Sequence, residues 1–69
     1  MMQLFNYKNA LADFNKAIEL NPQNGEAFFY RGLTKIQLNH TDAGCWDLSK
    51  AGELGVSLAY DAINDYCRK

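Results

Sequence analysis

The chain repeats part of itself after 34 residues. The segment from Ala10 to Pro22, ALADFNKAIELNP, returns as the segment from Gly44 to Val56, GCWDLSKAGELGV, with five of thirteen residues identical at the same offsets. A fixed period between about 20 and 50 residues is typical of solenoids, in which each unit buries its apolar face by stacking on a neighbour. The repetition therefore predicts a stack of similar helical units. The identical pairs are Asp13/Asp47, Lys16/Lys50, Ala17/Ala51, Glu19/Glu53 and Leu20/Leu54.

In the first copy, Ala10, Phe14 and Ala17 lie on one helical stripe that ends before Pro22. This pattern resembles the tetratricopeptide repeat (TPR). The family's unit is a helix pair of 34 residues, and its second helix carries small, aromatic and small residues before a closing proline. The resemblance extends over residues 6–55 and, by analogy, over the segment that follows.

Four positions depart from the family's pattern. Arg31 stands where the family is usually apolar, Lys35 where it is usually aromatic, Gly44 where it has alanine, and Val56 where it has proline. The period itself does not depend on a family consensus, so the register is kept through these departures.

The resemblance implies an all-α fold of four helices. Antiparallel helix-turn-helix repeats would stack as a short right-handed solenoid that forms a single domain. In this register, residues 6–24 hold the second helix of an incomplete repeat, residues 25–56 a complete repeat, and residues 57–69 a capping helix.

Hydrophobic periodicity predicts the same four helices independently of the family. Apolar residues recur at spacings of three and four, and the breaks between them contain residues that end or begin helices. Asn6, Thr41 and Ser57 are candidate N-caps, Pro22 closes the first turn, and Gly55 suits the left-handed position after a helix. The expected helices cover residues 7–20, 26–39, 42–54 and 58 to about 67.

The second expected helix is apolar over more than one stripe. Phe28 and Gly32 suit the contact within a helix pair, because glycine lets two helix backbones approach closely. In the TPR family, the first helix of each pair lines a concave groove that receives partner peptides. The resemblance therefore implies a partner-binding groove made of Glu26, Phe29, Tyr30, Leu33, Ile36 and Gln37.

The sequence is compatible with two different binding partners for this groove. One is an amphipathic peptide or helix of a partner protein, and the other is a second copy of the chain. In the repeat register, the helix over residues 7–20 lacks the helix that precedes it in a full repeat. We therefore expect homo-oligomerisation through this open end or through the groove helix.

Composition argues against membrane and nucleic-acid binding. Seven basic and eight acidic side chains are interspersed and give a formal charge of −1, which offers no basic face to a phosphate backbone. A helix-turn-helix nucleic-acid-binding protein is the alternative, but the third expected helix sets Lys50 against Asp42, Asp47 and Glu53. No apolar run approaches the roughly 18 residues of a membrane span, and no signal peptide is recognisable, so the cytoplasm is expected.

No pattern of catalytic or metal-binding residues stands out, so we expect a non-enzymatic protein without cofactors or bound metal. His40 falls in a turn, and its spacing from Cys45 and Cys67 fits no usual zinc motif. Two cysteines do not make the disulfide framework of a small secreted domain, and both are expected to be small buried apolar residues, although Cys67 near the end is a candidate for oxidation. Trp46 is expected to pack in the core or in an interface.

Overall fold

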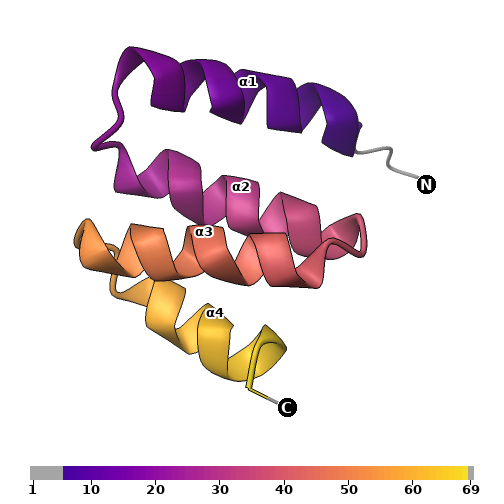
Figure 1. The fold of residues 1–69 in the computed structure, drawn as a ribbon, viewed down its shortest axis with the longest axis vertical. Helices are drawn as coiled ribbons and strands as arrows, with labels where there is room; N and C mark the ends of the chain where they lie inside the picture. The colour runs from indigo at the N-terminus through magenta and orange to yellow at the C-terminus, as the bar shows by residue number, and fades with distance from the viewer. Residues whose placement is uncertain (1–5, 69) are drawn as a thin grey trace.

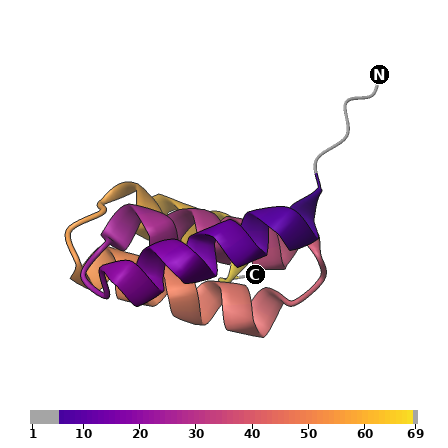
Figure 2. The ribbon, with the colours of Figure 1, turned by 90° about the horizontal axis from the view of Figure 1, so that it is seen from above.

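The computed structural model describes residues 6–68 as an all-α arrangement, which confirms the predicted fold class in its coarse form. Consecutive helices run in opposite directions and lie beside one another in chain order (Figure 1). Seen from above, the helices are inclined to one another rather than strictly parallel (Figure 2). Lys69, the last residue of the expected capping helix, lies outside the described residues. The helices are α1 (Tyr7–Leu20), α2 (Gly25–Gln37), α3 (Thr41–Glu53) and α4 (Leu58–Tyr66).

The helix starts follow the 34-residue period. α1 begins at Tyr7 and α3 at Thr41, which is 34 positions later. Asn6 caps α1 as predicted, because its side-chain oxygen accepts a hydrogen bond from the Asn9 amide at 3.1 Å. Asn24 caps α2 in the same way through the amide of Ala27. Thr41 is the first residue of α3 rather than its cap, so the expected cap is one position too late.

Two left-handed residues end helices. Gly55 has φ of +103° and follows Leu54, the C-cap of α3, which confirms the role expected for it. Asn39 has φ of +68° after α2, a conformation that asparagine tolerates better than most residues. The second helix therefore ends at Gln37, two residues before the expected end. Both turns reverse the chain within a few residues and bring the next helix back alongside the last.

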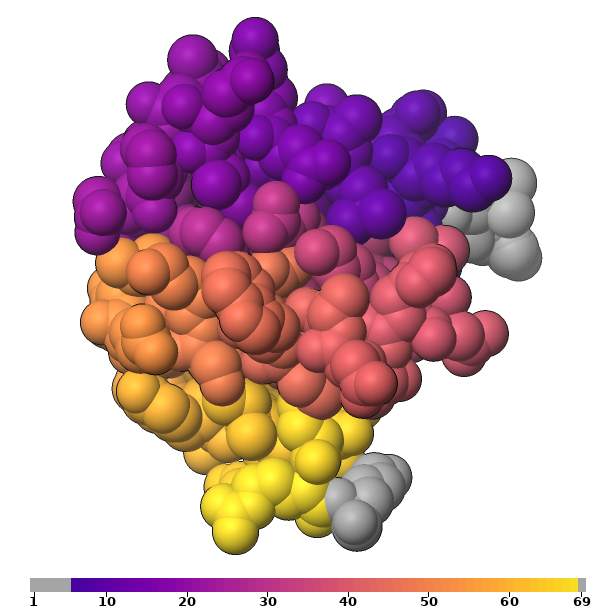
Figure 3. Space-filling model, viewed as in Figure 1, coloured from indigo at the N-terminus to yellow at the C-terminus, as the bar shows by residue number. Residues whose placement is uncertain are grey.

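The core lies between α2, α3 and α4, while α1 contributes no buried residue. Its members are mostly small, with Phe28 and Leu48 as the large buried side chains. On the face seen in Figure 3, α2 shows only a narrow band between α1 and α3. The molecule is 18 Å across its shortest axis, less than two helix diameters of about 10–12 Å. α1 lies at one edge of this single layer of helices and packs mainly against α2.

Two glycines let α2 and α3 approach each other closely in the core. A Cβ placed on Gly32 would lie 2.7 Å from the carbonyl oxygen of Gly44, and one on Gly44 would lie 2.5 Å from that of Gly32. Phe28 and Gly32 are both buried here, which confirms the expected contact within the helix pair. The glycine at position 44, a departure from the family's alanine, is therefore needed for this approach.

Replacing Gly32 with alanine is expected to destabilise the protein by about 1–2 kcal/mol. Overpacking costs about 1–3 kcal/mol, and the upper part of that range applies because the new Cβ meets a backbone carbonyl, while helix propensity returns about 1 kcal/mol. Gly52→Ala is the matched control, because its new methyl group would meet only the half-exposed ring of Tyr60, which can rotate away. Urea unfolding followed by circular dichroism should rank Gly32→Ala below Gly52→Ala. Equal free energies of unfolding for the two variants would contradict this, because they would show that α2 can move away from α3 without loss of stability.

Cys45 and Cys67 form a disulfide, so the expectation of two small buried apolar residues is wrong. The bond joins the first half of α3 to the residue that follows α4, across a Cα–Cα distance of 6.0 Å. Both residues are half-buried. The antiparallel turn between α3 and α4 brings the two positions together, although they are 22 residues apart in the chain. The bond closes the carboxyl-terminal hairpin.

Trp46 lies outside the core. Its side chain is 64% exposed on the solvent side of α3, opposite the buried residues of that helix. A core role for Trp46 is therefore excluded, and an interface role stays a prediction.

Candidate helix-binding site

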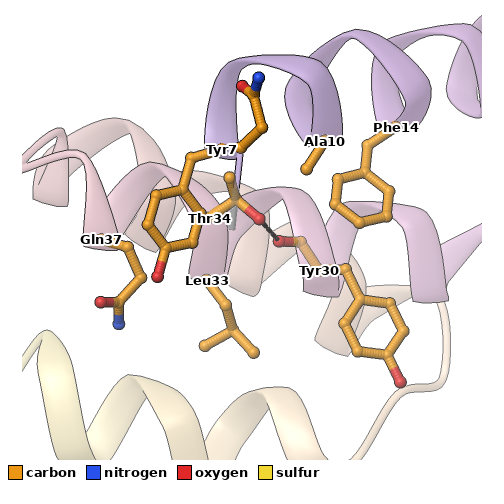
Figure 4. Close-up of a pocket in the computed structure, with 8 residues that line it drawn as sticks. Tyr7, Ala10, Phe14, Tyr30, Leu33, Thr34 and Gln37 are labelled. Carbon is orange, nitrogen blue, oxygen red and sulfur yellow. Dashed lines mark hydrogen bonds between the residues drawn. The ribbon is translucent and has the colours of Figure 1, made fainter. Parts of the chain in front are cut away.

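A pocket of about 270 Å³ opens between the first half of α1 and the second half of α2. Tyr7 stands at one end and Phe14 with Tyr30 at the other, with Ala10 and Thr34 between them (Figure 4). The hydroxyl of Thr34 donates to the carbonyl oxygen of Tyr30 at 2.8 Å. The lining is mainly apolar, and the hydroxyl of Thr34 near its middle is occupied by this hydrogen bond. The residues that line the pocket are Asn6, Tyr7, Ala10, Phe14, Tyr30, Leu33, Thr34 and Gln37.

Aromatic contacts hold one wall of the pocket in place. The ring of Phe14 on α1 stacks on that of Tyr30 on α2, with centroids 6.0 Å apart and planes inclined by 19°. Phe29 meets the same tyrosine edge to face at 5.2 Å. Tyr30 nevertheless stays 49% exposed. A large, oriented and half-exposed aromatic side chain is a typical anchor for a protein partner.

The structure brings three of the six expected groove residues together. Tyr30, Leu33 and Gln37 line the pocket. Phe29 and Ile36 are partly buried against the core cluster, and Ile36 lies beside Gly44 of α3. Glu26 is exposed in the first turn of α2, outside the pocket.

The half of the pocket contributed by α1 was absent from the expected groove. Tyr7, Ala10 and Phe14 belong to the apolar stripe that predicted the first helix. Their spacing marked them as residues that pack, and the family register placed the groove on the other helix. The signal was therefore present in the sequence, but it indicated burial where the structure shows a half-covered face.

A buried carboxylate connects α3 to α2. Asp47 is fully buried, and its two oxygens accept hydrogen bonds from Nε and Nη2 of Arg31 at 2.9 Å each. Nζ of Lys35 lies 3.0 Å from Oδ2 of the same carboxylate. Arg31 also donates from Nη1 to Asn15 on α1, and its guanidinium lies over the ring of Phe28. This arrangement gives Arg31 and Lys35 a structural role, at positions where the repeat that the sequence resembles has apolar and aromatic residues.

The residues considered for metal binding do not form a site. The sulfur atoms of Cys45 and Cys67 are bonded to each other, and His40 is exposed at the cap position of α3. Within residues 6–68, no group of three or more histidine, cysteine, aspartate and glutamate side chains is placed to hold a metal ion. The pocket between α1 and α2 is thus the candidate site with a defined chemical character.

Comparisons of the chain with protein-family models, curated proteins and solved structures found no match. In the part of the chain that the structure describes, no helix combines the length and apolar character needed to cross a membrane.

Proposed function

We propose that this chain is a non-enzymatic protein-interaction module, a TPR-like helical repeat that binds an amphipathic helix of a partner protein. The observation that carries the proposal is the apolar pocket between α1 and α2, with half-exposed Tyr30 at its wall. The recurrence of helix starts after 34 residues and the stacking of helices in chain order support the TPR-like part.

A helix suits the pocket by its dimensions. The lining residues of α1 run from Asn6 to Phe14 and those of α2 from Tyr30 to Gln37, about 10 Å along each helix. Two rows of side chains over that length form a groove that accepts about two helical turns. An amphipathic helix binds such a groove through residues spaced by three or four positions.

Self-association through the same surface is the second part of the proposal. In the absence of a partner, two copies would cover each other's α1–α2 surface, because stacked units need neighbours to bury their apolar faces. Binding of a partner helix would then compete with formation of the dimer.

Replacing Tyr30 with glutamate is expected to abolish self-association. A charge in the pocket must lose its hydration when a second copy covers it, which should raise the dimer dissociation constant at least about tenfold. Light scattering coupled to gel filtration at micromolar concentration should show a dimer for the natural sequence and a monomer for the variant. Tyr66→Glu is the control, since Tyr66 is similarly exposed on α4. A natural chain that stays monomeric would contradict the self-association.

The disulfide links the structure to the redox state of the compartment. The cytoplasmic location expected from the sequence stays a prediction, and in a reducing cytosol the bond between Cys45 and Cys67 would be open. In an oxidising compartment it would close α4 onto α3. The pocket lies on α1 and α2, away from the disulfide, so the proposed binding does not depend on this bond.

A further inference from the structure

The face of α3 that holds α2 shows how one helix of this chain receives another. Its contact residues Gly44, Asp47, Leu48 and Ala51 are all buried. Gly44 meets the backbone of Gly32 on α2, and Leu48 lies against the same glycine. Asp47 binds two cations of α2. One small residue, one carboxylate and two apolar side chains thus form the face of α3 that binds α2. We call such a set of four residues a helix seat.

α1 carries the same four residue types on a face that no helix of the described residues covers as α2 covers α3. Positions 34 residues earlier hold Ala10, Asp13, Phe14 and Ala17, so the small residue, the carboxylate and the two apolar side chains all recur. None of the four is buried: Asp13 is exposed and the other three are half-buried. Ala10 and Phe14 line the pocket. α1 contacts α2 through a neighbouring stripe that includes Asn15 and Ile18, and of the four residues Phe14 also stacks on Tyr30 at its edge.

The carboxylate of Asp13 indicates which charge a helix bound to this face of α1 would carry. Its equivalent Asp47 is neutralised by Arg31 and Lys35, which are four residues apart on one face of α2. Asp13 makes no ion pair or side-chain hydrogen bond with the residues that the structure describes. A helix that sits on α1 as α2 sits on α3 would place its own two basic side chains over Asp13.

We infer that the α1 face formed by Ala10, Asp13, Phe14 and Ala17 receives a partner helix that carries a small residue and two basic residues four positions apart. The first basic residue directly precedes the small residue, as Arg31 precedes Gly32, and the second follows the small residue by three positions, as Lys35 does. This inference rests on the proposed helix-binding function and names the chemistry of the partner.

A second copy of the chain does not meet this requirement. Arg31 and Lys35 are the only two basic residues in the sequence that are four positions apart. Both are already bound to Asp47 of their own chain, and α3 covers that side of α2. A second copy can therefore cover the apolar part of the seat but does not offer Asp13 the pair of cations that Asp47 binds. The charge complementarity therefore favours a partner helix of a different sequence over a second copy of residues 1–69.

The methyl group of Ala10 changes one detail of the seat. Gly44 allows α2 to approach until a Cβ would lie 2.5 Å from the carbonyl oxygen of Gly32. Ala10 has that Cβ, so the partner helix must lie farther from α1 than α2 lies from α3. This looser approach leaves the basic side chains, which are long and flexible, able to reach Asp13.

The test uses a synthetic peptide with the sequence of residues 24–39, NGEAFFYRGLTKIQLN, labelled with a fluorophore. Anisotropy titration with the full chain should show saturable binding. Asp13→Asn should weaken binding by about tenfold, the worth of hydrogen bonds to a charged group. Glu19→Gln, which removes another exposed acid of α1, should leave the affinity unchanged. A peptide with glutamine in place of both basic residues should bind the natural chain and the Asp13→Asn variant equally.

The outcomes separate this inference from the function on which it rests. Binding that is lost with Tyr30→Glu but unchanged with Asp13→Asn would overturn the basic-helix inference and leave the helix-binding pocket in place. No binding of either peptide to the natural chain would overturn both. A loss with Asp13→Asn that persists for the glutamine peptide would also contradict the inference, since the effect would not come from the basic pair.

Discussion

Replacing Asp47 with alanine is expected to lower the free energy of unfolding by about 3 kcal/mol. The substitution leaves Arg31 and Lys35 without their common anion while α3 still covers them. Breaking a buried ion pair by removing one partner costs about 3–5 kcal/mol. The lower end applies here, because the two basic side chains keep 16% and 25% exposure and can turn partly toward water.

The internal repeat supplies the control for this experiment. Asp13 occupies the equivalent position on α1 but is exposed, so Asp13→Ala should change stability by less than about 0.5 kcal/mol. Urea unfolding followed by circular dichroism measures both variants. Similar losses for the two substitutions would contradict the assigned role of Asp47, because only one of the two carboxylates is buried.

A triple variant keeps the prediction testable if Asp47→Ala fails to fold. Arg31→Met, Lys35→Met and Asp47→Leu together replace all three charges with apolar side chains. Apolar replacement of buried ion clusters is often neutral or stabilising, so the triple variant should fold with at least the natural stability. A triple variant as unstable as Asp47→Ala would show that packing around position 47, rather than its charge, is what the single substitution disturbs.

Removal of the disulfide has an expected effect of similar size. Replacing Cys45 and Cys67 with alanine should lower the free energy of unfolding by about 3 kcal/mol, the value that the chain-entropy model gives for a separation of 22 residues. The loss should fall mainly on α4. That helix is nine residues long, and its buried residues are only Ala59 and Ala62. It has little apolar area with which to stay on α3 without the bond.

Hydrogen exchange of the natural and Cys45→Ala/Cys67→Ala chains measures this effect by region. Amides of α4 should lose most protection, while those at the interface of α2 and α3 should lose less, because they belong to the largest helix contact. Adding a reductant to the natural chain should reproduce the result of the substitutions. Unchanged protection of α4 in the reduced chain would contradict the view that the disulfide holds this helix.

The sequence predicted the helices well where local signals agree. The stripe of apolar residues and the cap at Asn6 define α1 to the residue, and Gly55 ends α3 as expected. The contact of Phe28 and Gly32 with α3 also followed from the pattern. In each case the signal lies within one or two turns of helix, where spacing and backbone preference determine the outcome.

The errors concern residues whose role depends on the packing of separate helices. The bond between Cys45 and Cys67 requires the relative position of α3 and α4, which periodicity does not supply. Trp46 was expected in the core or in an interface because large aromatic side chains are usually buried, but it lies on the solvent side of α3. The charges of Arg31 and Lys35 on α2 are explained by Asp47 on α3, which pairs with both of them in the folded chain.

The site was predicted in part for the same reason. Family register placed the groove on one helix, which identified Tyr30, Leu33 and Gln37. The other wall comes from α1, whose residues are half-covered rather than buried. Whether an apolar stripe is covered depends on what lies beside the helix, and one helix's own sequence does not contain that information.

Intermolecular nuclear Overhauser contacts between the full chain and the peptide of residues 24–39 test the central claim most directly, namely that α1 receives a helix as α3 receives α2. We expect contacts from the α-protons of the peptide's second glycine, equivalent to Gly32, to the methyl group of Ala10, with further contacts from the peptide to Ala17. This register repeats the opposition of Gly32 and Gly44 within the chain. Contacts confined to α3 or α4, or a peptide that meets α1 in a different register, would contradict the account.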